Sequence, residues 1–198
     1  MSEEDVGKRL AEVNQSIYLN KLLIDLDQNY ENLKIVIENI INLFNNELIN
    51  KTYEILLEDE TVTTRENISG TVKDFFTILK NHIITNLDSN KKVLESIVVT
   101  NDFMKYVNQI ETMTGALCES LSALYKSQST DLINNISKGL SYFSRSRIEN
   151  LVNEILFNRF IIKVKSSLSD VNLILINNYQ ENNNYLEHMN EKTGLAII

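Results

Sequence analysis

The sequence contains no proline and only five glycines among its 198 residues. Average usage would supply about ten prolines in a chain of this length. Folds with many tight turns need both residues, whereas long helices joined by few connections need neither. The two shortages therefore predict a fold of long helices.

Cysteine and histidine are equally scarce, which limits the chemistry that the chain can perform. Cys118 is the only cysteine, so no intrachain disulfide can form, and we expect it to be a small buried side chain. Neither His82 nor His188 has a glutamate three residues before it, as a ferritin-like di-metal bundle would require. A zinc site of the usual kind lacks ligands. We predict no metal, and a partly buried structural role for His82.

Motifs of the common enzyme classes are also missing. The glycines are too scattered for a phosphate-binding loop, a nucleophile elbow or a dinucleotide fingerprint. The carboxylates lie at spacings typical of solvated helix faces. The sequence therefore predicts a protein that is not an enzyme, with no catalytic residues and no cofactor.

Long apolar runs are absent as well. No stretch approaches 18 consecutive apolar residues, so we expect no membrane-spanning helix, and Leu195–Ile198 is too short to act as an anchor. The first five residues are acidic rather than apolar, which predicts no signal peptide. The expected location is intracellular (cytoplasmic) or within a viral particle.

One stretch, Ile17–Leu57, carries the clearest periodic pattern. Its apolar residues recur at alternating spacings of four and three, which is the seam of a long amphipathic helix. The seam comprises Leu19, Leu23, Leu26, Tyr30, Leu33, Ile37, Ile40 and Phe44. A separate stripe, formed by Val6, Leu10, Val13 and Ile17, does not line up with it.

The rest of the chain has the pattern of further helices. Thr61–Thr64 should be a loop or a short extended piece. A second helix is expected from Ser69 to a break at residues 88–90, followed by a short helical piece to Val98. Thr100, Asn101 and Asp102 should cap a third helix. A fourth is expected from Ser129, and a capping box of Ser146 and Glu149 should open a fifth. Residues 181–198 form a weakly periodic, Asn-rich tail for which we expect flexibility.

These elements together predict an all-α fold in a single domain, residues 1–198. We expect an elongated bundle of about five helices around one long central amphipathic helix. The abundance of asparagine and isoleucine is typical of an AT-rich genome, as in many viruses, phages and low-GC bacteria. The formal net charge of −8 argues against a general nucleic-acid binder.

Basic side chains are concentrated in one segment of this acidic chain. Between residues 138 and 165 the only acids are Glu149 and Glu154, so the segment carries +4 and the remainder −12. The segment either docks against the acidic long helix or forms a solvated face. Alternatively it is a patch for an acidic partner, a phosphate or an anionic membrane. Its cations are Lys138, Arg145, Arg147, Arg159, Lys163 and Lys165.

Three isoleucines interrupt the polar side of the long helix. Ile17, Ile24 and Ile35 are spaced seven and eleven apart, and both spacings return to nearly the same helix face. Either this helix contacts neighbours on two sides within its own bundle, or the isoleucines form a surface for self-association or for a protein partner.

Two functional hypotheses follow from these patterns. The first is a non-enzymatic structural, scaffold or interaction protein that works through helix–helix contacts, including coiled-coil pairing, with itself as a homo-oligomer or with a protein partner. A viral, phage or secretion-system component would fit the composition. The alternative is a membrane-acting helical bundle that binds anionic lipid surfaces. A nucleic-acid role rests on the basic segment alone and ranks third.

Overall fold

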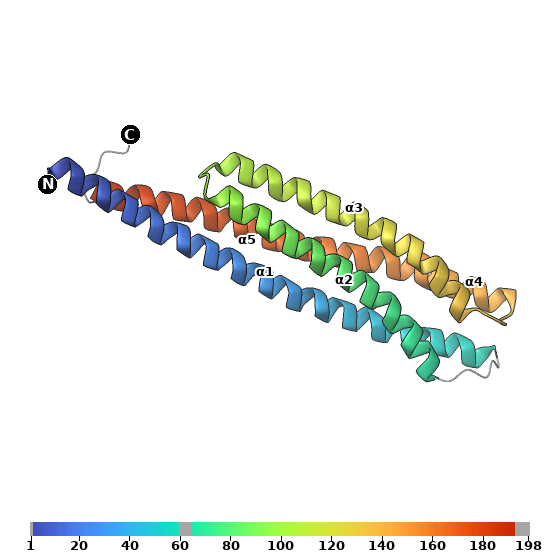
Figure 1. Ribbon diagram of the computed structural model, residues 1–198. Helices are drawn as coiled ribbons and strands as arrows, with labels where there is room; N and C mark the ends of the chain where they lie inside the picture. Colours follow the sequence, from blue (N-terminus) through green and yellow to red (C-terminus); the bar gives the residue numbers. More distant parts are fainter. Residues whose placement is uncertain (1, 60–64, 193–198) are drawn as a thin grey trace. The chain divides into compact units, whose positions relative to one another are not determined.

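The computed structural model describes residues 2–59 and 65–192, and it is all-α (Figure 1). The helices are α1 (Glu3–Glu58), α2 (Arg65–Val98), α3 (Phe103–Ile136), α4 (Tyr142–Asn150) and α5 (Phe157–Lys192), with a π-helical turn, η1 (Leu151–Leu156). The described ranges contain no β-strand. The expected loop at Thr61–Thr64 and the segment Leu195–Ile198 lie outside these ranges.

Residues 2–59 and 65–192 form four continuous helices, not about five. The elements α4, η1 and α5 follow one another without a break from Tyr142 to Lys192. Helix α3 runs through Ser129, where a new helix was expected to begin. Helix α2 continues through residues 88–90, because these polar residues lie on its more exposed side, where solvent accommodates them.

The start of α3 is placed as predicted. The Asp102 carboxylate accepts a hydrogen bond from the Lys105 backbone N–H at 3.1 Å, which satisfies one of the free donors at the helix start. The start of α4 is different from the prediction. Ser141 caps it by accepting a hydrogen bond from the Ser144 N–H, and Ser146 lies inside the helix. The predicted capping box therefore does not open a helix.

The Asn-rich segment is helical up to Lys192. Asn182 is buried, and its side-chain amide donates to the Asn178 backbone carbonyl at 2.7 Å. This bond to the preceding turn lets a short polar side chain lie within a helix. The tail expected from residue 181 is thus part of α5, and residues 193–198 lie outside the described ranges.

The contacts of the chain divide it into two compact units. Unit 1 draws on residues 1–32, 88–113 and 169–198, and unit 2 on residues 33–87 and 114–168. In unit 1 the buried rings of Tyr106 and Tyr179 lie 4.7 Å apart. In unit 2 the rings of Phe44, Phe76 and Phe160 meet edge to face, at centroid distances of 5.6 and 5.7 Å. Each unit has its own apolar core.

The predicted seam of α1 is buried over most of its length. Its unit 1 residues Leu26 and Tyr30 and its unit 2 residues Leu33, Ile37, Ile40 and Phe44 are each at most 5% exposed. Leu19 and Leu23 are only half-buried. The four-three spacing therefore identified the core face of the helix correctly from Leu26 onward.

Candidate functional site

The three isoleucines predicted to lie away from the seam are exposed. Ile17, Ile24 and Ile35 expose 56%, 67% and 59% of their surface. No described part of the chain covers them, so they are not inner contacts of a helix with neighbours on two sides. Ile17 and Ile24 belong to unit 1 and Ile35 belongs to unit 2.

Within unit 1 the exposed isoleucines extend a longer aliphatic surface. Leu10, Ile17 and Ile24 are seven residues apart, as are Val6 and Val13, and all five are exposed. This is the spacing of the two apolar positions of a coiled-coil heptad. We call this surface, formed by Val6, Leu10, Val13, Ile17 and Ile24, the α1 stripe.

The α1 stripe is exposed because other residues of α1, which are small or polar, form the contact between α1 and α5. Asn14 donates a side-chain hydrogen bond to Asn190 at 3.3 Å, and the ring of Tyr18 lies 5.0 Å from that of Tyr185. Gly7 and Ala11, in line with these two residues, are half-buried. The aliphatic side chains next to this line are left at the surface.

The arginines of the basic segment are engaged in ion pairs within unit 2. Arg147 pairs with Glu58, and Arg159 with Glu47, so both dock onto α1. Arg145 pairs with Glu149 at 3.2 Å on its own helix. The pairs of Arg147 and Arg159 support the interpretation that the segment packs against the acidic long helix. The lysines of the segment, Lys138, Lys163 and Lys165, are exposed.

Glu47 is the acceptor for two cations of unit 2. The hydrogen bond from Arg159 lowers the pKa of the Glu47 carboxyl, and Lys51 at 2.8 Å adds to this effect. The Arg159 guanidinium also lies 5.3 Å from the centre of the Phe44 ring. Arg159 therefore contacts both a charged residue of α1, Glu47, and a core residue of the same helix, Phe44.

We predict that Arg159→Gln lowers the unfolding free energy by about 1 kcal/mol, because it removes a partly exposed ion pair and a cation–π contact. The matched variant Lys163→Gln, one turn further along the same exposed surface, should change it by less than about 0.5 kcal/mol. Urea unfolding at low and high salt measures both effects. Part of the Arg159 effect should disappear at high salt. Equal losses for the two variants would contradict this assignment.

His82 and Ser120 lie within hydrogen-bond distance of each other in unit 2. The Ser120 hydroxyl donates to the Leu117 carbonyl at 3.1 Å. The His82 Nε2 atom lies 2.9 Å from the Ser120 oxygen, and the Asn86 side-chain amide lies 3.5 Å from the same nitrogen. His82 is half-buried, as the sequence predicts.

Cys118 lies on α3 in unit 2 and is half-buried, whereas the sequence predicts a buried side chain. Its burial raises the pKa of the thiol above the ordinary value, and the charge of Lys165 opposes the shift. A raised pKa reduces the fraction of the nucleophilic thiolate.

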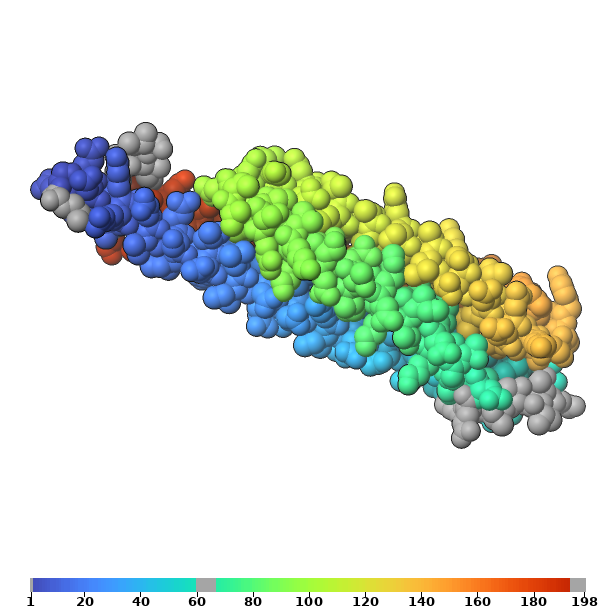
Figure 2. Space-filling model, in the orientation of Figure 1, coloured from blue at the N-terminus to red at the C-terminus, as the bar shows by residue number. Residues whose placement is uncertain are grey.

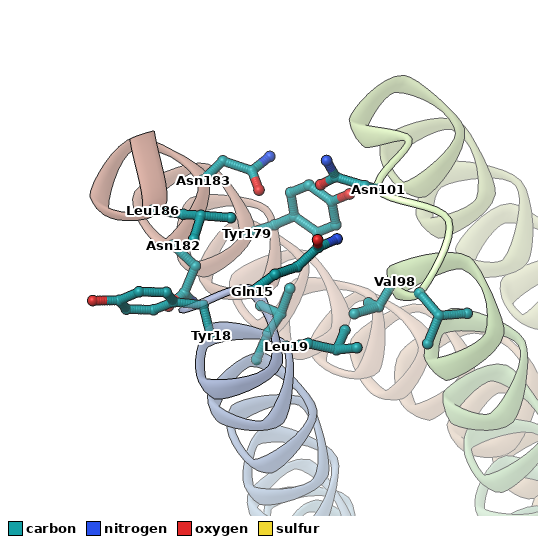
Figure 3. A pocket seen from close by; sticks show the side chains of 11 residues that line it. Gln15, Tyr18, Leu19, Val98, Asn101, Tyr179, Asn182, Asn183 and Leu186 are labelled. Atoms are coloured by element: carbon teal, nitrogen blue, oxygen red, sulfur yellow. The ribbon is translucent and has the colours of Figure 1, made fainter. Parts of the chain in front are cut away.

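A small cavity of about 40 Å³, with a mixed polar and aliphatic lining, lies in unit 1 between α1, α5 and the α2–α3 turn (Figure 3). Its polar lining is neutral and comes from Gln15, Asn101, Asn182, Asn183 and the two phenols Tyr18 and Tyr179. The buried Tyr179 hydroxyl lacks a hydrogen-bond partner in the described part of the chain. The cavity has room and partners for an ordered water, and it is too small for a metabolite.

A larger, open cavity of about 310 Å³ lies in unit 2 beside the π-helical turn. It is lined by Lys51, Glu54 and Ile55 of α1 and by residues of α4 and η1, including Arg147. Both of its cations are already paired, Lys51 with Glu47 and Arg147 with Glu58. The cavity therefore offers no free cation to an anionic ligand.

Over the described ranges, no three His, Cys, Asp or Glu side chains converge as metal ligands. Within the same ranges, none of the helices has the length and apolarity needed to cross a bilayer. A scan against protein-family models and searches of curated proteins and of solved structures each give no match. A functional assignment must therefore be argued from the surfaces of this chain.

Proposed function

We propose that this chain is a non-enzymatic structural or scaffold protein that acts through helix–helix contacts, and that the α1 stripe is its contact surface. The supporting observation is the stripe itself, five exposed aliphatic side chains at heptad spacing on one helix face. Scattered exposed aliphatic residues are ordinary, whereas a continuous apolar surface marks an interaction site.

The α1 stripe is large enough to support an association. Full burial of one aliphatic side chain stabilises by about 1.5–3 kcal/mol, so completing the burial of five half-exposed ones gives roughly 5 kcal/mol. A second helix packed along the stripe would recover this amount before the entropic costs of association. The partner is a second copy of the chain or another helical protein, and a viral, phage or secretion-system assembly fits the AT-rich composition.

We predict that the full chain self-associates and that Ile17→Lys/Ile24→Lys abolishes the association. Lysine at these positions places charge in the apolar contact, while the exposed sites leave the fold unaffected. Size exclusion coupled to light scattering should show an oligomer for the native sequence and a monomer for the double variant, with a nearly unchanged melting temperature.

Ile162→Lys is the matched control, because Ile162 is equally exposed but lies on α5 in unit 2. This variant should keep the oligomer. A native chain that stays monomeric at every concentration would rule out self-association. Unfolding of the double variant would show that the stripe is an internal surface.

A further inference from the structure

The turn between α3 and α4 carries the most exposed aromatic side chains of the described chain. Tyr142 and Phe143, consecutive at the start of α4, are 89% and 72% exposed. Both belong to unit 2, and Lys138 is exposed four residues before Tyr142. We call Lys138, Tyr142 and Phe143 the aromatic tip.

The aromatic tip is held by a well-defined turn. Gly139 has φ +81°, a left-handed conformation that glycine adopts without strain, and the Leu140 N–H donates to the Ser137 carbonyl at 3.0 Å. The Ser141 and Ser144 hydroxyls donate to the Asp59 carboxylate at 2.7 and 2.6 Å. The serines on either side of the two aromatic residues thus tie the turn to the end of α1, while the rings remain outside.

In the described part of the chain, the segment that carries the aromatic tip is basic. The stretch from residue 132 to residue 148 contains Lys138, Arg145 and Arg147 and no acidic residue. Two of the neighbouring carboxylates are engaged in ion pairs, Glu58 with Arg147 and Glu149 with Arg145. The third, Asp59, accepts hydrogen bonds from the Ser141 and Ser144 hydroxyls. The exposed Lys138 ammonium therefore accompanies the two rings.

We propose that the aromatic tip inserts its two rings into the headgroup region of an anionic lipid bilayer. The 89% exposed side chain of Tyr142 has few neighbours in the described chain and therefore projects from the surface. The α3–α4 turn lies at the surface in the space-filling view (Figure 2). A bilayer accepts convex aromatic groups at its interface, and a basic side chain beside them is attracted by anionic lipids.

A single tryptophan can test the insertion directly, because the chain contains none. With phosphatidylcholine vesicles containing phosphatidylserine, Phe143→Trp should give a blue-shifted emission that brominated lipids quench. Ile162→Trp, at an exposed site on α5, should show neither effect. An unshifted and unquenched spectrum for Phe143→Trp would overturn the proposal and leave a protein as the partner of the tip.

Vesicle co-sedimentation of the full chain provides the second measurement. Tyr142→Ser/Phe143→Ser should weaken binding at least about tenfold, and Lys138→Glu should reduce its dependence on phosphatidylserine. Undiminished binding of the double serine variant would also contradict the proposal. The α1 stripe variant Ile17→Lys/Ile24→Lys should bind vesicles normally, since the inference is independent of the proposed helix–helix function.

Discussion

Replacing Ile37 with alanine should lower the free energy of unfolding by about 2–5 kcal/mol, the usual cost of truncating a buried isoleucine. Ile37 is 0% exposed and lies on the α1 seam of unit 2. The loss has two parts, the transfer free energy of the removed methyl and methylene groups and the cavity that close-packed neighbours cannot fill.

Ile35 provides a matched control two residues away on the same helix and in the same unit. Because Ile35 is exposed, Ile35→Ala should change stability by no more than about 0.5 kcal/mol. Urea unfolding followed by far-ultraviolet circular dichroism measures both variants. A loss below about 1 kcal/mol for Ile37→Ala would show that the seam is misplaced.

The core face of α1 was predictable because a buried helix face requires apolar residues at every third or fourth position, and this spacing is visible in the sequence. A residue such as Leu33 or Ile37 is apolar because its helix face points inward, and the face returns every three to four residues. The same geometry predicted that Ile24 and Ile35 point away from the core, and both are exposed.

The helix ends were harder to predict, because residues that favour caps also occur within helices. The Ser129 hydroxyl donates to the Lys126 carbonyl of the preceding turn at 2.9 Å, so a buried serine continues α3 where a cap was expected. Asp88 lies on an exposed face of α2 and does not interrupt it. Local propensity cannot distinguish a cap from such a position without knowledge of the neighbouring helices.

The candidate surfaces were predictable only in part. The sequence predicts one stripe of Val6, Leu10, Val13 and Ile17 and a separate group of Ile17, Ile24 and Ile35. The signal that joins the stripe to Ile24 is the helix direction that these residues share. The charge count of the basic segment could not reveal that Arg147 pairs with Glu58, 89 residues away. Contacts between distant segments depend on tertiary packing.

Removing the side chain of Tyr125 should destabilise unit 2 by about 3–5 kcal/mol, as expected for a buried aromatic residue replaced by alanine. The Tyr125 ring is fully buried, with centroids 5.2 Å from Phe75, 5.1 Å from Phe157 and 6.0 Å from Phe160. Tyr125→Ala would therefore leave a cavity among several rings and remove the edge-to-face contacts with Phe75 and Phe157.

The hydroxyl group of Tyr125 has a separate role in the π-helical turn. It donates to the Val152 carbonyl at 2.9 Å, and the same carbonyl accepts the Phe157 backbone N–H, five residues further on. A backbone hydrogen bond between residues i and i+5 defines a π-helix. Such turns are rare and wider than an α-helical turn. We infer that the hydroxyl stabilises η1 by occupying the second acceptor position of the Val152 carbonyl.

Tyr125→Phe separates the two contributions, because it keeps the ring and removes only the hydroxyl. We expect it to cost about 0.5–1.5 kcal/mol, the net value of a hydrogen bond, against the larger loss for Tyr125→Ala. Hydrogen exchange should become faster at the amides of η1 and of Phe157 and stay unchanged elsewhere in α5. A phenylalanine variant with native stability and native exchange would show that the widened turn does not depend on this bond. Equal losses for the two variants would instead assign the stabilisation to the hydroxyl rather than to the ring.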